Sequence, residues 1–409
     1  MADSAPVPDG VPADGRVLAT NCGSSSVKLA LVDPRTGERA VEGLAERVGT
    51  ADVALHLRRG REAVALEAPD DVSHLGVVSA MVHALSDDER ASVSATGHRV
   101  VHGGARFTAS VLVDDEVLAG LADVTHLAPL HTPGNIAGIL AARAALPGVP
   151  DVAVFDTAFH RTLPPHAYRY AVPKAWFEEH GVRRFGFHGI SHRYVSGRAA
   201  EMLGRDVRDL HLVTVHLGNG CSACAVREVE SVDTTMGLTP LEGLVMGTRS
   251  GDIDAGALGY VGHRTGLDLD GVVAALTHES GLLGISGLSN DMRTLVEAAD
   301  AGDGDAALAV DVFCYRAAKA VCAMASGLDR IDAVVLTGGI GEHATVVRSR
   351  IMRHLGVLGV VEDAAANAEH GRSTYGRVSA EGATYVLVVP TDEELMIARD
   401  TAALVATVD

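Results

Sequence analysis

Several short segments of the sequence combine glycine or serine with residues that could bind a phosphate. The first spans residues 21–28 and reads N-C-G-S-S-S-V-K. Small residues in a turn let backbone N–H groups converge on one anion, the hydroxyls of Ser24 and Ser26 add donors, and Lys28 adds a positive charge. A phosphate-binding turn is one interpretation, and an ordinary serine-rich hairpin turn is the other. The sequence holds no G-x-x-x-x-G-K-[ST] segment, so a P-loop is excluded.

Two further glycine-rich segments follow predicted strands. Residues 216–220 read H-L-G-N-G, and residues 337–343 read T-G-G-I-G-E-H. The Asn219-Gly220 pair is also typical of a type I′ hairpin turn, so this segment has a purely structural interpretation too. Glycines in the later segment would let a purine or ribose lie against the backbone, with a helix starting behind them. Together with the serine-rich turn, these segments favour loops that grip one nucleoside triphosphate.

Two arginines lie among glycines. Arg99 belongs to G-H-R-V-V-H-G-G, and Arg249 belongs to M-G-T-R-S-G-D. Phosphoryl transfer needs little covalent help from a protein, but it needs charge stabilisation and in-line positioning. Two arginines could hold a carboxylate on one side and the equatorial phosphoryl oxygens on the other. The alternative is that both are surface arginines in loops.

Two acidic residues could handle a magnesium ion. Asp156 follows the predicted strand 152–155, and Glu393 opens the last predicted helix. A carboxylate acceptor is ionised near neutral pH and needs no general base, so we expect Asp156 to handle magnesium or to position the reactants. Each residue has a structural alternative, because aspartate is a common helix N-cap and glutamate in a first helical turn complements the helix dipole.

Histidine and cysteine pairs invite a metal-site interpretation that the sequence does not favour. His188 and His192 have the i, i+4 spacing of a zinc pair, but the glutamate of H-E-x-x-H is missing. We expect His188 to donate a hydrogen bond to the transferring phosphoryl group and His192 to be structural. Cys221 and Cys224 have C-x-x-C spacing, but no second pair of zinc-finger spacing accompanies them.

The elements that must position these residues follow an α/β pattern. Residues 17–33 and 212–226 each read as a strand, a tight polar turn and a second strand. Two such hairpins suggest a duplicated α/β domain, in which each half presents one turn to a shared cleft. Short β-branched runs predict further strands at 152–155, 333–339 and 384–389, and apolar spacing of three and four predicts helices at 135–146, 192–203, 306–326 and 393–406.

The predicted organisation is therefore two domains after a short tail. The acidic, Pro/Gly-rich residues 1–15 lack the basic and apolar regions of a secretory signal. The N-terminal domain is expected to comprise residues 16–160, and the last helix, with residues 393–409, is expected to return to it. The C-terminal, nucleotide-binding domain is expected to comprise residues 161–392.

Charge and cysteine usage exclude several classes of partner. The formal net charge of −19 argues against a nucleic-acid-binding surface and against docking to an anionic membrane. No run approaches the roughly 18 apolar residues that cross a bilayer. Five scattered cysteines in a chain of 409 residues suggest reduced thiols, and hence a cytoplasmic protein.

These motifs occur together and in order in one known family. They are N-x-G-S-S-S-x-K, G-H-R-V-V-H-G-G, F-D-T-A-F-H, F-H-G-x-S-H, H-L-G-N-G, S-V-D-T-T-M-G-x-T-P-L-E-G, M-G-T-R-S-G-D and P-T-x-E-E. From about Val17 to the C-terminus the chain resembles the acetate kinases, within the acetate and sugar kinase/Hsp70/actin superfamily. The resemblance implies a duplicated ribonuclease-H-like (actin-like ATPase) fold with a nucleotide cleft between its domains. It also implies a homodimer and the reversible, Mg²⁺- or Mn²⁺-dependent formation of acetyl phosphate and ADP from acetate and ATP.

The resemblance also implies roles for individual residues. The catalytic residues would be Asp156, His188 and Arg249. Acetate would be bound by Arg99, with a small acyl pocket formed by Val101, Leu130, Phe187 and Pro240 and with His131 beside it. The nucleotide would contact Ser24, Ser26, Lys28, His216, Leu217, Gly218, Asn219, Gly220, Asp291, Met292, Arg293, Gly339, Ile340, Gly341, Glu342 and His343. The metal would be bound by Asn21 and Glu393.

Two positions depart from the family pattern. Met292 stands where the family usually has Phe in Asn-Asp-Phe-Arg, and His343 stands where it usually has Asn. Both belong to the implied nucleotide site, so they bear on nucleotide preference and affinity and not on the reaction.

Three alternatives to an acetate kinase follow from the same residues. A propionate or butyrate kinase differs only by methylenes, each of which discriminates by about 1–3 kcal/mol in an apolar pocket. Val101 favours acetate, because a smaller residue would admit a longer chain. An ATP-driven switch of the actin or chaperone type would not need Arg99 and Arg249. A sugar kinase would need a base near a hydroxyl and a polar sugar pocket, which the sequence does not offer.

Overall fold

The computed structural model describes residues 15–407, so the predicted N-terminal tail lies outside the described residues except for its last position. The chain divides into two compact units, unit 1 up to Phe159 and from Asp392 onward, and unit 2 from His160 to Thr391. The predicted domain boundaries each lie one residue further along the chain. That these units are the two domains of the family, with a nucleotide cleft between them, stays a prediction.

Unit 1 is built on a mixed sheet of eight strands with the order β5-β4-β3-β2-β1-β6-β8-β7. Strands β1 to β5 are joined as antiparallel neighbours, whereas β1, β6 and β8 run parallel. The strands are β1 (Arg16–Cys22), β2 (Ser26–Val32), β3 (Arg39–Glu46), β4 (Ala54–Arg59), β5 (Glu62–Leu66), β6 (Val93–Val100), β7 (Val111–Leu112) and β8 (Asp151–Phe155).

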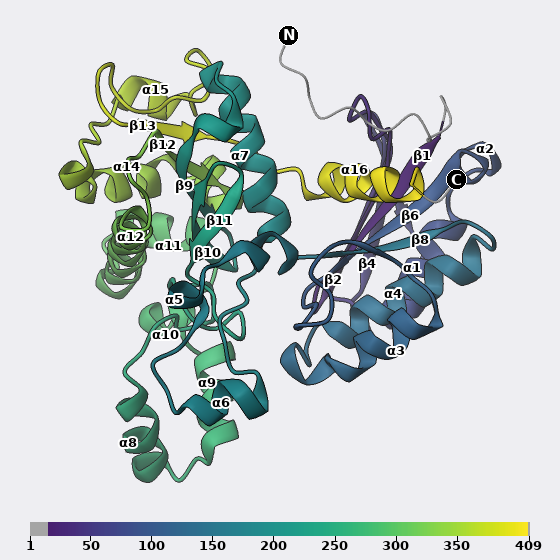
Figure 1. Cartoon of the computed structure of the whole chain (residues 1–409), viewed down its shortest axis with the longest axis horizontal. Helices are drawn as coiled ribbons and strands as arrows, with labels where there is room; N and C mark the ends of the chain where they lie inside the picture. Colours follow the sequence, from purple (N-terminus) through teal and green to yellow (C-terminus); the bar gives the residue numbers. More distant parts are fainter. Residues whose placement is uncertain (1–14, 408–409) are drawn as a thin grey trace. The chain divides into compact units, whose positions relative to one another are not determined.

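Helices cover both faces of this sheet (Figure 1). One face carries α1 (His74–His83), α3 (Asp115–Asp123) and α4 (Thr132–Ala145), and the other carries α16 (Glu393–Val405). The short helix α2 (Asp87–Ala91) lies between α1 and β6 in the chain and buries none of its residues. Leu18, Leu29 and Met81 belong to the apolar core beneath α1 and α4. On the α16 side, a Cβ on Gly97 would lie 2.3 Å from Thr401 Oγ1, so only glycine lets α16 pack this closely on β6.

Unit 2 is built on a mixed sheet of five strands with the order β11-β10-β9-β12-β13. Here β9, β10 and β11 are antiparallel neighbours, and β12 lies parallel to both β9 and β13. The strands are β9 (His211–Leu217), β10 (Cys221–Arg227), β11 (Glu230–Thr234), β12 (Ala333–Thr337) and β13 (Tyr385–Val388).

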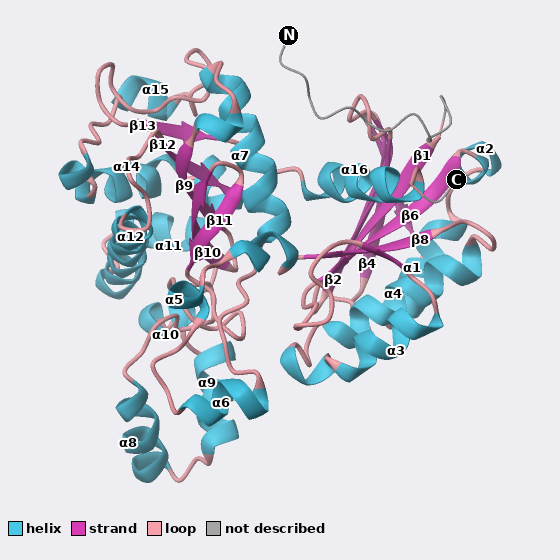
Figure 2. Ribbon diagram, in the orientation of Figure 1, coloured by secondary structure: helices cyan, strands magenta, loops and turns pink. Residues whose placement is uncertain are grey.

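Helix α7 (Gly189–Leu203) contacts β9 and β12 of this sheet, and α12 (Gly304–Ala325) contacts β9 and β10 (Figure 2). Among the described residues, unit 2 also contains α13 (Gly338–His343) and eight further helices. These are α5 (Pro165–Tyr168), α6 (Lys174–His180), α8 (Ala255–Thr265), α9 (Leu269–His278), α10 (Gly281–Ser286), α11 (Met292–Asp300), α14 (Thr345–His354) and α15 (Ala364–Ala368). Within residues 15–407, no helix combines the length and the apolar character that crossing a bilayer would need.

The two sheets repeat one topology. In each sheet the first strand, β1 or β9, has an antiparallel hairpin partner on one side, followed by a further antiparallel strand. On its other side lie two strands that run parallel to it. The orders are β3-β2-β1-β6-β8 in unit 1 and β11-β10-β9-β12-β13 in unit 2. The hairpins β1–β2 and β9–β10 are those predicted at 17–33 and 212–226. The α/β class and the duplication are therefore confirmed, and so are the four predicted helices, as α4, α7, α12 and α16.

Candidate active site

Strand register in unit 1 sets three predicted site residues in one row. Asn21 on β1 pairs with Lys28 on β2 and with Arg99 on β6. Cross-strand partners share a face of a sheet, and Gly97, two residues before Arg99, faces α16. Lys28, Asn21 and Arg99 therefore lie on the α16 side of the sheet, at the end where that helix begins.

The Arg99 guanidinium is clamped by two residues of this unit. It donates a hydrogen bond to Asn21 Oδ1 at 3.0 Å and forms an ion pair with Asp156, whose side chain is fully buried. Burial opposes the charge on Arg99, but the carboxylates of Asp156 and Glu393 outweigh that effect and raise the pKa of Arg99. Asp156 thus acts as the counter-ion of Arg99, and not as a helix N-cap.

Two atoms of this pair are buried without a hydrogen-bond partner among the described residues: Arg99 Nε and Asp156 Oδ1. A buried donor or acceptor left unpaired costs about 1–3 kcal/mol, so native proteins seldom keep one without a reason. One spare donor beside one spare acceptor is typical of a site that a ligand or ion completes.

Glu393 lies at the first position of α16, next to the same cluster. Its Oε2 accepts a hydrogen bond from Asn21 Nδ2 at 3.2 Å. Burial raises the pKa of the Glu393 carboxyl to about 7, with Asp156 adding to the rise and Arg99 opposing it. The N-cap is Asp392, which accepts from Leu395 N at 2.9 Å, so Glu393 is not needed as a cap.

The remaining predicted residues of unit 1 differ in their exposure and in their hydrogen bonds. Gly23 N donates to Ser26 O at 2.8 Å, which closes the serine-rich turn and leaves Ser24 exposed. Val101 is 3% exposed and its N–H donates to Asn135 Oδ1 on α4, whereas Leu130 is 53% exposed. His131 is the residue that immediately precedes α4.

In unit 2 the structure brings His188, His216 and Arg249 together. The His188 and His216 rings stack with centroids 4.4 Å apart. A Cβ on Gly220 would lie 3.4 Å from the His188 ring and 3.7 Å from Arg249 NH1, so both side chains border this glycine. Arg249 NH1 also donates to Pro240 O at 3.0 Å.

The loop that carries Arg249 is fixed by a glycine. Gly281 has φ +62°, and a Cβ there would lie 2.3 Å from Met246 O and 2.7 Å from Arg249 O. Leu282 N donates to Met246 O at 2.9 Å. A side chain at Gly281 would therefore displace the Arg249 loop.

The turn at 216–220 is not a type I′ turn. Such a turn needs positive φ at both central residues, and neither Asn219 nor Gly220 has it. The turn is closed by Gly218 N donating to Gly220 O at 3.1 Å, and Asn219 O accepts from Gly247 N at 3.0 Å. The alternative of an ordinary Asn-Gly hairpin turn is wrong, and the segment is joined to the Arg249 loop.

The segment 338–343 is a short helix, α13 (Gly338–His343), and not the glycine loop with a helix behind it that we expected. Glu342 Oε1 accepts from Gly338 N at 3.1 Å and from Thr391 N at 3.1 Å, so this carboxylate fastens the start of α13 within its own unit. The side chain of the buried Arg348 donates to Gly341 O and Glu342 O, near the C-terminal end of α13. These bonds explain why six residues with three glycines form a helix.

The three nucleotide residues at 291–293 differ in exposure. Asp291 is the N-cap of α11 and accepts from Thr294 N at 2.8 Å, and Arg293 is exposed. Met292, the departure from the family pattern, is only 4% exposed. Its side chain packs inside unit 2, so it can influence a nucleotide only by moving its neighbours. His343, the other departure, is exposed.

Cys221 and Cys224 do not form a joint site. Both lie on β10, and residues three apart on a strand point to opposite faces. Both are buried, and burial raises the pKa of each thiol to about 12. Cys221 Sγ donates to Gly218 O at 3.2 Å, and Cys224 Sγ lies 3.2 Å from Ser231 Oγ.

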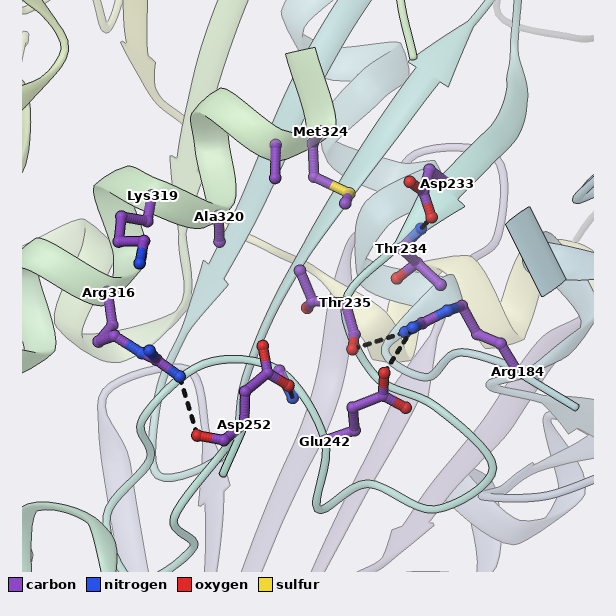
Figure 3. Close-up of a pocket in the computed structure, with 12 residues that line it drawn as sticks. Arg184, Asp233, Thr234, Thr235, Glu242, Asp252, Arg316, Lys319, Ala320 and Met324 are labelled. Atoms are coloured by element: carbon purple, nitrogen blue, oxygen red, sulfur yellow. Dashed lines mark hydrogen bonds and ion pairs between the residues drawn. The ribbon is translucent and has the colours of Figure 1, made fainter. Parts of the chain in front are cut away.

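A separate cavity of about 260 Å³ lies in unit 2, between β11, α12 and the Arg249 loop (Figure 3). None of the predicted site residues lines it. Figure 3 shows Arg184 reaching Glu242 on one side and Arg316 reaching the Asp252 backbone on the other, and Arg316 NH2 lies 2.9 Å from Asp252 O. Four residues of the S-V-D-T-T and M-G-T-R-S-G-D motifs line this cavity: Asp233, Thr234, Thr235 and Asp252.

Repeated α/β units with arginines, amides and acidic groups at their strand ends define a phosphotransferase-type architecture. A family profile described as the Acetokinase family matches residues 16–399, and the chain belongs to that family. The family prediction is confirmed, and with it the class of enzyme, a phosphotransferase that has a carboxyl group as acceptor and ATP or ADP as co-substrate.

Individual relatives agree with this assignment. The acetate kinase of Deinococcus radiodurans is 54% identical over 390 residues, which is 95% of this chain and 98% of that protein. The crystal structure of Porphyromonas gingivalis acetate kinase is 40% identical, with a TM-score of 0.87 over 96% of this chain and 100% of that one. The crystal structure of a propionate kinase from Francisella tularensis is also 40% identical, with a TM-score of 0.88 over 95% and 99%.

Proposed function

We propose that this protein is an acetate kinase, which transfers the γ-phosphoryl group of ATP directly and reversibly to a carboxylate oxygen of acetate. The observation that carries the proposal is the Arg99 cluster of unit 1. Arg99 is held by Asn21 and Asp156, yet it keeps one buried donor unpaired. A guanidinium fixed in this way is suited to bind a carboxylate, because its remaining N–H points in a set direction.

Asn21 and Glu393 are the residues that would hold Mg²⁺. Magnesium prefers oxygen ligands and commonly takes one or two carboxylates, with water and phosphate oxygens completing its shell. The unpaired, buried Oδ1 of Asp156 beside Arg99 fits a bound cation or its water. When bound, the metal would neutralise charge on the phosphates. Asp156 would orient Arg99 and not remove a proton, since acetate is already ionised.

In unit 2, His188 and Arg249 would donate to the phosphoryl oxygens as charge develops on them. Both border Gly220, which has no side chain to block a ligand. The nucleotide would lie along residues 216–220 and 291–293 and against the start of α13, where backbone N–H groups are available. For the serine-rich turn and Lys28 of unit 1 we propose binding to phosphate.

A hydroxamate-trapping assay tests the activity and the substrate together. With Mg-ATP and acetate, propionate or butyrate in turn, we expect trapped acyl phosphate with the highest kcat/KM for acetate. The physical reason is the buried Val101, which narrows the acyl pocket, although one methylene is worth only about 1–3 kcal/mol. If a longer acid ranks first, the substrate is wrong and the chemistry stands. If no acid yields acyl phosphate while ATP still binds, the proposal is wrong.

We also propose a cytoplasmic homodimer. Its support is an apolar surface on α8, α9 and the segments beside them, where six large apolar side chains of unit 2 are exposed: Ile253, Tyr260, Val261, Leu267, Leu269 and Val273. Exposed large apolar side chains gathered on two helices are typical of protein interfaces. Sedimentation equilibrium should give twice the chain mass of 42.3 kDa, and Leu269→Glu should shift it to the monomer. A monomeric wild-type protein would exclude the dimer.

A further inference from the structure

Residues 237–243 of unit 2 form a loop after β11, with Pro240 near its middle. The carbonyl of Pro240 accepts a hydrogen bond from Arg249 NH1 at 3.0 Å. At the start of the loop, Gly237 O accepts from the backbone N–H groups of residues 185 and 186, at 3.0 and 3.3 Å. Those two residues directly precede the F-H-G-x-S-H segment. The loop is therefore hydrogen-bonded both to the candidate arginine and to the segment that leads into the candidate histidine.

Three side chains hold the two ends of this loop together, and we call them the polar network: Tyr170, Arg184 and Glu242. Glu242, near the end of the loop, accepts a hydrogen bond from the Tyr170 hydroxyl and forms an ion pair with Arg184 (Figure 3). At the start of the loop, Leu238 N donates to the same Tyr170 oxygen at 3.0 Å. Arg184 NH1 also donates to the carbonyls of residues 235 and 236, at 2.8 and 3.2 Å. The network thus joins residues on both sides of Pro240.

The network leaves no room for a side chain at Gly237. A Cβ on this residue would overlap both Glu242 Oε2 and the Tyr170 hydroxyl, so only glycine fits there. Burial, with the charge of Glu242 adding to it, raises the pKa of Tyr170, so the hydroxyl keeps its hydrogen and donates it to the carboxylate. The glycine of T-M-G and the glutamate of L-E-G, two letters of one motif, therefore meet in a single contact.

The base of the loop lies beside empty space. Arg184, Glu242 and Gly243 all line the cavity of about 260 Å³ (Figure 3). Protein interiors are otherwise close-packed, and groups that border a void lose packing contacts on that side. Outside the polar network, Asp252 holds the end of the loop, because its Oδ1 accepts from Gly243 N at 2.8 Å. Release of the polar network would therefore leave the loop space into which it can shift.

We infer that Tyr170 and Glu242 are positioning residues for acyl selectivity, which hold the loop so that Pro240 limits the length of the acid that fits. The inference rests on the proposed function, because the place of Pro240 beside the acyl group follows from the family resemblance. A proline ring has little conformational freedom, so the position of the loop sets how far it projects. An apolar pocket discriminates one methylene by about 10- to 200-fold. A loop that can shift should therefore accept a longer acid and bind acetate less well.

The variant Tyr170→Phe tests the inference through the ranking of substrates. It removes only the hydroxyl that joins Leu238 to Glu242. We expect the ratio of kcat/KM for acetate to kcat/KM for butyrate to fall about tenfold, with most of the change in the KM for acetate. Glu242→Gln loses the ion pair with Arg184 and should lower the ratio by a smaller factor. If Tyr170→Phe lowers kcat/KM equally for all acids, or for none, the inference is overturned.

Tyr315→Phe is the matched control. Tyr315 is an exposed tyrosine of α12, and its hydroxyl makes no hydrogen bond within residues 15–407. Its substrate ratio should be that of wild type. Hydrogen exchange followed by mass spectrometry tests the loop without turnover, since the amides of residues 237–243 should exchange about tenfold faster in Tyr170→Phe than in wild type. Unchanged exchange would overturn the inference, whereas a wild type that forms no acyl phosphate from any acid would contradict the proposed function.

Discussion

Replacing Arg99 with alanine is expected to raise the KM for acetate by about 30- to 100-fold, with a smaller effect on kcat. Charge-assisted hydrogen bonds to a carboxylate contribute about 1.5–3 kcal/mol, and the guanidinium is already oriented by Asn21 and Asp156 before substrate arrives. Steady-state kinetics with varied acetate at saturating Mg-ATP would measure the change. An unaltered KM would contradict the assignment of Arg99 to the carboxylate.

The same change removes the counter-ion of a fully buried aspartate, so a loss of stability must be separated from a loss of binding. Breaking a buried ion pair from one side typically costs about 3–5 kcal/mol. Arg143 offers a matched control, because its Nε lies 3.0 Å from the buried Asp151 on the same sheet. Arg143→Ala should lower the melting temperature and leave the KM for acetate near the wild-type value. Arg99→Lys keeps the positive charge but loses the paired N–H donors of the guanidinium. Its KM for acetate should lie between those of wild type and Arg99→Ala.

The sequence was not enough to predict the row of polar residues in unit 1. It predicted a strand before the polar turn that holds Asn21, but none before Arg99, and only the parallel pairing of β1 with β6 brings the two residues to one edge of the sheet. The partner of Arg99 could not be assigned. Asp156 had three possible roles, and only the fold brings it against the guanidinium and buries it there.

Local patterns failed where distant residues decide the backbone. Three glycines predicted a loop at 338–343, but the segment is a helix. Arg348 donates to two of its carbonyl groups, and the backbone N–H of Thr391 donates to the Glu342 carboxylate. The Asn-Gly pair predicted a hairpin turn of common type, but hydrogen bonding to the Arg249 loop selects another. In both cases tertiary contacts override a local preference, which for glycine within a helix is about 1 kcal/mol per residue.

Arg249→Ala is expected to lower kcat by about 10³-fold while the KM for acetate changes less than about threefold. A guanidinium that stabilises charge developing on the transferred phosphoryl group acts mainly in the transition state, and its loss therefore appears in kcat. In the protein described here Arg249 is held by the carbonyl of Pro240 and by a loop that Gly281 fixes. That anchoring reduces the freedom the side chain would lose on reaching the transition state.

Arg316→Ala is the control that separates this role from support of the loop. Like Arg249, Arg316 donates to a backbone carbonyl near this loop, but its side chain lines the cavity of Figure 3, apart from His188 and Gly220. Its replacement should leave kcat within about threefold of wild type, because a single exposed hydrogen bond contributes only about 0.5–1.5 kcal/mol to stability. Equal losses in both variants would mean that disturbing the loop is the cause. A large loss in Arg249→Ala alone, with ADP binding retained, would assign the guanidinium to the transition state.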